Sequence, residues 1–130
     1  MKKYLRFLLT LLVLGTIACK KKTVEADPYA FLHGSWQYAN GAECIYEPAT
    51  KSAKGTKVPN NNASFKFVVG EAYWKNVVST GTDKWEYEQI VRFSDGTTVE
   101  YRKSTMSKKD ENTLTINTPG LSDSSLKRIK

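Results

Sequence analysis

The sequence predicts an all-β fold, a small antiparallel meander that closes into a barrel and is preceded by a short helical turn. From residue 36 onward, apolar and polar side chains mostly alternate with the period of two that is typical of half-buried strands. These alternating runs recur about every 10 to 15 residues, are rich in Tyr, Trp, Val and Thr, and are separated by turns that contain glycine. Helical spacing extends over no more than about one turn in this part of the chain.

The single helical turn is expected just before the first strand. Pro28 suits the first position of a helix, and Asp27 is a residue type that caps helix N-termini. Three apolar residues would dock this turn on the barrel, namely Tyr29, Phe31 and Leu32.

The strongest strand is expected at 85–93, where alternate residues form one face: Trp85, Tyr87, Gln89, Val91 and Phe93. Gln89 on this face indicates either a core amide with satisfied hydrogen bonds or a wet interior. Ser94-Asp95-Gly96 is a tight-turn signal that makes the next run its antiparallel mate. The expected strands, in chain order, are 36–46 with a bend at Gly41, 65–69, 73–78, 85–93, 99–101, 114–116 and 126–129.

The segment 47–63 shows no periodicity and contains Pro48, Gly55, Pro59 and three consecutive asparagines. Irregular segments of this length inside a compact domain are usually functional or disordered. Two interpretations stay open at this point, a lid over a barrel mouth and a flexible connection.

The first 18 residues have the composition of an export signal. Lys2, Lys3 and Arg6 precede an apolar run at 7–17, which is shorter than the roughly 20 residues that a spanning helix needs. The Ala18-Cys19 pair that follows resembles the lipobox of bacterial lipoproteins, with Thr16 where the family pattern has Leu.

The lipobox resemblance implies cleavage before Cys19 and attachment of lipid to its thiol. The protein would then be lipid-anchored in the cell envelope, and we expect the outer membrane, with its periplasmic or surface face left open. An uncleaved N-terminal anchor and ordinary cleavage with an unmodified Cys19 are the alternatives. Residues 19–27 are expected to form the lipidated tether, and residues 28–130 the barrel domain.

Charge and cysteine content limit the classes of partner. Without the three basic residues of the signal, the net charge falls from +7 to about +4, and part of this excess is Lys20-Lys21-Lys22 beside the anchor. Those lysines suit anionic lipid headgroups. The remaining charge is nearly balanced, so we expect no nucleic-acid partner. Cys44 is expected to be a buried small hydrophobic residue.

Gly34-Ser35-Trp36, after a short apolar turn and before a strand, resembles the Gly-x-Trp motif that opens the first strand of lipocalins and lipocalin-like barrels. The resemblance implies that the turn plugs one barrel end and that Trp36 packs across its base. It also implies a basic residue of the last strand over that Trp, and Arg128 is in the matching place, with Lys127 as the alternative. The chain is shorter than the usual member, and the second family motif, Thr-Asp-Tyr, is absent.

Catalytic constellations are scarce, and we expect no enzymatic activity. His33 has no paired base in the sequence, and Glu86 and Glu88 alternate on what is expected to be a solvent-facing side of a strand. Metal-ligand spacing of Cys and His is absent, so neither a metal nor a cofactor is expected.

The leading hypothesis is a binding module whose barrel takes a small hydrophobic or amphipathic ligand. Its candidate ligand-binding residues are Tyr38, Phe65, Phe67, Trp85, Tyr87 and Gln89. The alternative for these aromatic residues is a barrel filled by its own side chains. Such a barrel would act as an envelope protein-interaction module, an inhibitor or assembly subunit, through an exposed strand edge or the 47–63 segment.

Overall fold

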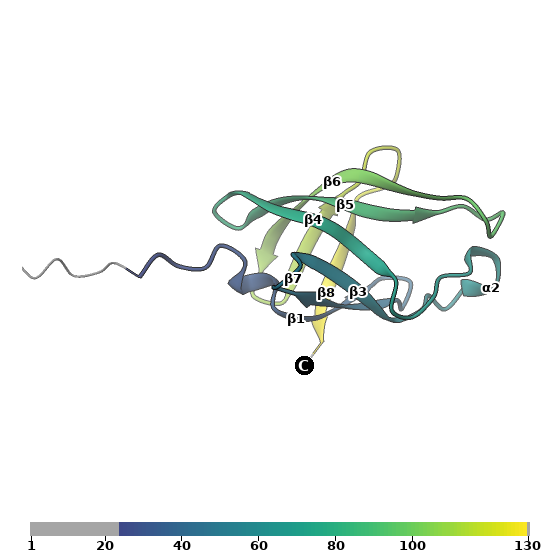
Figure 1. Ribbon diagram of the computed structural model, residues 1–130, viewed down its shortest axis with the longest axis horizontal. Helices are drawn as coiled ribbons and strands as arrows, with labels where there is room; N and C mark the ends of the chain where they lie inside the picture. The colour runs from purple at the N-terminus through teal and green to yellow at the C-terminus, as the bar shows by residue number, and fades with distance from the viewer. Residues whose placement is uncertain (1–23, 130) are drawn as a thin grey trace, which may run out of the picture.

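The computed structural model describes residues 24–129, which form a closed barrel of eight antiparallel strands (Figure 1). A 3-10 turn, η1 (Ala30–Leu32), precedes the barrel, and a short helix, α2 (Asn62–Phe65), lies between its third and fourth strands. The strands are β1 (Gly34–Tyr38), β2 (Glu43–Glu47), β3 (Ser52–Lys57), β4 (Ala72–Gly81), β5 (Lys84–Arg92), β6 (Val99–Asp110), β7 (Thr113–Asn117) and β8 (Ser124–Ile129). The predicted all-β meander that closes into a barrel after a short helical turn is confirmed.

Each strand pairs with its neighbours in sequence, and β1 pairs with β8 to close the sheet. In this closing pair Trp36 lies opposite Arg128. Every strand of the described barrel has a neighbour on both sides, but the pairing does not extend along every strand, because β3 and β4 share two paired positions and Val99–Ser104 of β6 pair with β5 alone. A partner could therefore bind loops, the outer face of the sheet or the unpaired side of this part of β6.

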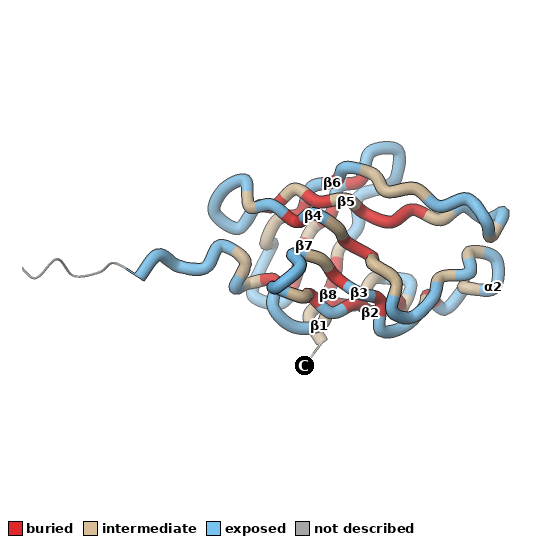
Figure 2. The backbone as a smooth tube through the Cα atoms, in the orientation of Figure 1, coloured by how far each residue is buried: buried red, intermediate tan, exposed pale blue. Residues whose placement is uncertain are grey.

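The buried residues of the strands form one hydrophobic core, and Figure 2 shows where they lie along the backbone. Its largest members are Trp36, Trp74, Trp85 and Tyr87, which are almost completely buried. In β5, the buried residues Trp85, Tyr87 and Gln89 alternate with partly exposed charged residues, as the period of two predicts.

The segment before β1 covers one end of the barrel, which we call the closed end. Trp36 Nε1 donates a hydrogen bond to the carbonyl of Leu32 at 2.9 Å, and Trp85 Nε1 donates to the carbonyl of Pro28 at 2.9 Å. The ring of Phe31 stacks on Trp85 with centroids 6.2 Å apart. The N-terminal segment leaves from this end, whereas α2 lies at the opposite end (Figure 1), which we call the open end.

The expected single bent strand at 36–46 is wrong, because Gly41 lies in a turn between β1 and β2. The N–H of Gly41 donates to the carbonyl of Tyr38 at 3.0 Å, and the N–H of Tyr38 donates to the carbonyl of Ala42 at 2.8 Å. Gly41 has φ of 85°, in the left-handed region that glycine adopts without steric cost. Asn40-Gly41 is thus a hairpin turn and not a bulge.

The segment 47–63 is not wholly irregular, because β3 lies within it. The buried residues of β3 are Ala53 and Gly55, where other strands carry large apolar side chains. A Cβ on Gly55 would lie 2.5 Å from the ring of Tyr73, so the small residue makes room for that ring. The inward positions of β3 are small, so this strand lacks the alternation of large apolar residues that marks a strand in the sequence.

The predicted strand at 65–69 is also wrong. Phe65 ends α2, and Lys66 follows with φ of 54°, a left-handed conformation that an extended strand does not contain. At the end of β5, Phe93 lies beyond the last strand residue and is 38% exposed, so it does not continue the inward face.

The predicted export signal at 1–18, the lipidation of Cys19 and most of the predicted tether lie outside the described residues. Residues 24–129 contain no helix with the length and apolar character required to cross a membrane.

Candidate ligand-binding cavity

A cavity of about 170 Å³ lies at the open end of the barrel. Its wall combines the end of β1 and the β1–β2 turn, the chain between β3 and β4, the second half of β5 and the β7–β8 turn. The apolar part of the wall comes from Tyr38, Phe67, Tyr73, Ile90, Ile116 and Leu121. The polar part comes from Asn40, Gln89, Thr118, Ser122 and Ser124.

Three of the six predicted ligand-binding residues line this cavity: Tyr38, Phe67 and Gln89. They come from β1, from the chain after α2 and from β5, so the closed barrel brings together residues that are far apart in sequence. The ring of Tyr73 completes the group, because it contacts Tyr38 and Phe67 edge-on at centroid distances of 6.1 Å and 5.6 Å.

The other three predicted residues do not line the cavity. Tyr87 is buried and is not part of the wall, although its hydroxyl donates a hydrogen bond at 3.0 Å to the wall residue Gln89. Trp85 packs at the closed end against Phe31. Phe65 is half-buried in α2 and is not part of the cavity wall.

The amide of Gln89 is the centre of a buried polar network. Its Oε1 accepts hydrogen bonds from the hydroxyls of Tyr38 at 3.2 Å and Tyr87 at 3.0 Å, and its Nε2 donates to the carbonyl of Ile90 at 3.1 Å. The Tyr38 hydroxyl accepts a hydrogen bond from Trp74 Nε1 at 2.6 Å. Because a backbone carbonyl can only accept, the contact with Ile90 identifies the nitrogen end of the amide. Gln89 is therefore a bonded core amide that also forms part of a cavity wall.

The cavity wall is electrically neutral. Its only ionisable side chains are the phenols of Tyr38 and Tyr73. Burial raises the pKa of Tyr38 well above its ordinary value. Burial, followed by the nearby carboxylate of Glu71, raises the pKa of Tyr73 to about 12. Both phenols therefore stay protonated at neutral pH.

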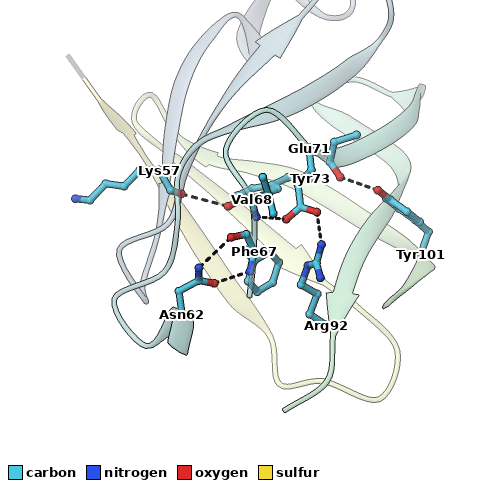
Figure 3. Close-up of polar contacts among 9 residues, drawn as sticks. Lys57, Asn62, Phe67, Val68, Glu71, Tyr73, Arg92 and Tyr101 are labelled. Carbon is cyan, nitrogen blue, oxygen red and sulfur yellow. Dashed lines mark hydrogen bonds and ion pairs between the residues drawn. The ribbon is translucent and has the colours of Figure 1, made fainter. Parts of the chain in front are cut away.

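The chain between β3 and β4, residues 58–71, lies at the open end, and we call it the lid segment. The Asn62 side chain holds Phe67 by two hydrogen bonds, since Nδ2 donates to the Phe67 carbonyl at 2.9 Å and Oδ1 accepts from the Phe67 N–H at 2.6 Å (Figure 3). The guanidinium of Arg92 lies 5.4 Å from the centre of the Phe67 ring and forms an ion pair with Glu71. These contacts fix the position of Phe67 at the cavity.

The lid segment contacts two separate parts of the rim. The N–H of Asn60 donates to the carbonyl of Asn40 at 2.9 Å in the β1–β2 turn. On the other side the β5–β6 turn packs tightly on it, because a Cβ on Gly96 would lie 2.9 Å from the carbonyl oxygen of Ser64. Of the segment 47–63 that the sequence left as either a lid or a flexible connection, residues 52–57 form β3, and residues 58–63 belong to the lid segment, which is hydrogen-bonded and packed at the rim.

Several cavity residues were missed at the level of sequence. Tyr73 and Trp74 are adjacent, and both are buried because β4 has a register irregularity against β3. Strict alternation assigns them to opposite faces, so it hides Tyr73. Pro59 and Thr118 lie in or next to turns, where no periodicity exists, and nothing in the sequence marks them as part of a wall.

The three residues of the lipocalin-like motif lie at the closed end. The guanidinium of Arg128 lies 4.4 Å from the centre of the Trp36 ring, and its nitrogens donate to the carbonyls of His33 and Phe31, both at 2.7 Å. Gly34 has φ of 104°, and a Cβ there would come within 3.5 Å of the guanidinium. Glycine thus suits both the backbone conformation and the approach of Arg128.

The polar side chains considered for catalysis do not converge. His33 is exposed, 3.5 Å from the Asp27 carboxylate. Glu86 forms an ion pair with Lys103 and does not line the cavity. Cys44 is a free thiol in the core, and burial raises its pKa. Residues 24–129 contain no cluster of three or more His, Cys, Asp or Glu residues with metal-binding geometry.

No family model, curated protein or solved structure matches the chain. The fold class is shown by the strand pairing, and the assignment of the barrel to the lipocalin-like family stays a prediction.

Proposed function

We propose that this protein is a lipid-anchored protein of the cell envelope whose lipocalin-like barrel binds a small hydrophobic or amphipathic ligand in the open-end cavity. The observation that carries the proposal is the cavity itself, which combines an apolar wall with a few convergent polar groups. It acts by binding and not by catalysis.

The distribution of aromatic residues supports a ligand. At the closed end, the ring of Phe31 packs against both Trp36 and Trp85, and the two tryptophans are almost completely buried. At the open end, Tyr38 and Phe67 line space that the chain does not fill. A barrel filled along its whole length by its own side chains would leave no such difference between its ends.

The position of the N-terminus bears on how the ligand arrives. The chain enters the barrel at the closed end, where Pro28 contacts Trp85, and the cavity lies at the other end (Figure 1). An anchor at Cys19 would then attach to the end that is remote from the mouth.

A cavity-filling variant tests the binding proposal. Ala42 is buried in the cavity wall, and Ala42→Leu would place three additional carbons in that space. Ala39→Leu is the matched control, since Ala39 is exposed in the same turn and outside the wall. Using the full-length chain with Cys19→Ser, we expect a series of uncharged short-chain alcohols to give saturable changes in tryptophan emission and amide NMR shifts. The changes should disappear in Ala42→Leu and persist in Ala39→Leu. A lack of saturation in the parent, or equal loss in both variants, contradicts the proposal.

The anchor has its own test. We expect the unmodified chain to fractionate with envelope membranes and the Cys19→Ser variant to be released, because two or three acyl chains hold a protein on a bilayer where one does not. Cys44→Ala is the control, since Cys44 is buried in the barrel core and should not affect fractionation. Recovery of the unmodified chain in the soluble fraction would contradict the lipid anchor.

The second candidate is an envelope protein-interaction module, and the rim of the cavity favours it. Four apolar residues are exposed around the open end, namely Val68, Val69, Phe93 and Leu121. Exposed apolar groups that gather around one site are typical of interaction surfaces. Because β3 lies within 47–63, a deletion there would break the barrel, so the double variant Val68→Ser with Val69→Ser is the better probe. Loss of an in-cell cross-link to an envelope protein, with alcohol binding intact, would favour this candidate.

A further inference from the structure

We infer that the cavity takes a compact, uncharged molecule about the size of one aromatic ring that carries a hydrogen-bond acceptor, and that Gln89 is the donor that selects it. This inference rests on the proposed binding function and adds the chemical class of the ligand. It is carried by the volume of the cavity, by the neutrality of its wall and by the hydrogen bonds of Gln89.

The volume limits the size of the ligand. The cavity holds about 170 Å³. An engineered apolar cavity of roughly 150 Å³ in another protein accommodates benzene, whereas pockets for drug-sized molecules are roughly 300–1,000 Å³. Below the cavity, Trp74 and Tyr87 are almost completely buried, so the barrel offers no further depth for a long acyl chain. One ring with a small substituent therefore fits.

The wall excludes a charged ligand. It contains no carboxylate, ammonium, guanidinium or imidazole group. The ion pair between Arg92 and Glu71 is not part of the wall, although Arg92 Nε has no hydrogen-bond partner within the described residues. A buried charge without a partner is strongly unfavourable, so a carboxylate or amine in this space would bind poorly.

The aromatic side chains favour a flat ring. Tyr73 contacts Phe67 and Tyr38 edge-on, at interplanar angles of 69° and 71°. Aromatic pairs prefer edge-to-face or offset contacts, and all three of these side chains line the cavity. A ring entering that space would extend an arrangement that the protein already has.

Gln89 lines the cavity and has a donor that is not fully used. Its Oε1 already accepts two hydroxyl hydrogen bonds, from Tyr38 and Tyr87, and so has no lone pair left for a ligand. Its Nε2 carries two protons, and one of them is used by the carbonyl of Ile90. Among residues 24–129 the structure gives the second proton no acceptor. The site therefore selects a ligand that accepts a hydrogen bond over one that only donates.

Three probes of nearly the same size test the inference: acetophenone, ethylbenzene and benzoate. We expect acetophenone to shift amide NMR signals in a saturable way, and the signal of the Gln89 side-chain amide should be among those that shift. Ethylbenzene lacks the acceptor and leaves the donor unpaired, so it should bind roughly tenfold more weakly. Benzoate carries a charge and should bind at least roughly a hundredfold more weakly. The protein is the full-length chain with Cys19→Ser, and Ala42→Leu should abolish all saturable shifts.

The variant Gln89→Leu should remove the preference for acetophenone over ethylbenzene, because it weakens acetophenone binding and also removes the donor that ethylbenzene leaves unpaired. If this variant does not fold, the role of Gln89 is tested in the parent protein, by whether acetophenone shifts the NMR signal of the Gln89 side-chain amide. Benzoate binding as tight as acetophenone, or an acetophenone complex that leaves the Gln89 amide unshifted, overturns the ligand class. If octanoate binds and Ala42→Leu abolishes that binding, while acetophenone does not bind, the proposed ligand class is wrong but the proposed binding function stands. Absence of saturable binding by every probe contradicts both.

Discussion

The guanidinium of Arg128 lies 4.4 Å from the centre of the Trp36 indole, and the two residues are opposite each other where β8 pairs with β1. The same guanidinium donates hydrogen bonds to the carbonyls of Phe31 and His33, which precede β1. One side chain thus joins the last strand, the first strand and the segment that covers the closed end.

Arg128→Ala should therefore lower the free energy of unfolding by about 2 kcal/mol, since it removes a cation–π contact and two charge-assisted hydrogen bonds. Lys127→Ala, one position away and exposed, should change it by less than about 0.5 kcal/mol. Urea denaturation of both variants gives the comparison. Similar losses for the two variants would show that the contact with Trp36 contributes nothing specific.

Asn62→Ala should loosen the lid segment, because the Asn62 side chain makes both hydrogen bonds to the backbone of Phe67. We expect faster amide hydrogen exchange in the lid segment and a loss of about 1–2 kcal/mol in unfolding free energy. Asn61→Ala is the matched control, because the Asn61 side chain makes no capping hydrogen bond with α2. If exchange rises equally in both variants, the two hydrogen bonds do not hold the lid.

Gly55→Ala should destabilise the barrel by about 1–3 kcal/mol, because the added Cβ would meet the ring of Tyr73 at 2.5 Å. Tyr73 would be displaced, so binding in the cavity should weaken as well. Gly81→Ala should be nearly neutral, since a Cβ there meets nothing within 4 Å. Thermal unfolding of the pair is the measurement, and an unaffected Gly55→Ala protein would rule out tight packing between β3 and Tyr73.

Stability should fall as the pH rises above about 10, the ordinary pKa of tyrosine in an unfolded chain. Burial raises the pKa of Tyr38 well above that value, and it raises the pKa of Tyr46 and of Tyr73 to about 12. Between about pH 10 and pH 12 the unfolded state therefore loses more protons than the folded state, and the free energy of unfolding decreases.

The measurement for this pH dependence is denaturant unfolding at several alkaline pH values, with tyrosinate absorbance recorded in parallel. Tyr46→Phe removes one raised phenol, whose hydroxyl makes no hydrogen bond within the described residues, and should make the alkaline loss shallower. Ionisation of all tyrosines near pH 10 without unfolding would contradict the prediction.

The sequence was sufficient for the fold class because the long strands follow simple patterning. In β5, buried Trp85 and Tyr87 alternate with charged residues, and Ser94-Asp95-Gly96 marks the turn into β6. Asp95 stabilises that turn through its carboxylate, which accepts hydrogen bonds from the N–H groups of Thr97 and Thr98. Local chemistry of this kind is visible in a sequence without knowledge of the partners.

The elements that were missed depend on distant residues. β3 has Ala53 and Gly55 at its buried positions because Tyr73, far along the chain, occupies the space beside them. The segment at 65–69 alternates like a strand, but Asn62 turns it into an irregular lid through hydrogen bonds to Phe67. Neither effect leaves a periodic signal.

The candidate site was only half predictable for the same reason. Tyr38 and Gln89 follow the inward alternation of their strands, so the pattern finds them. The pattern also selects Trp85, because alternation shows which face of the sheet a residue is on but not which end of the barrel it reaches. The position along the barrel axis depends on strand register, which only the structure shows.

The closure between β1 and β8 also has a kinetic consequence. All other pairings join strands that are consecutive in the chain, so they can form as hairpins with small loop-closure entropy, whereas this pairing must wait until both ends meet. Until β8 docks, β1 and β7 are unpaired edges and are exposed to intermolecular association. Folding of this barrel is therefore expected to proceed through local hairpins to a single late long-range step, whose rate depends on the contact between Trp36 and Arg128.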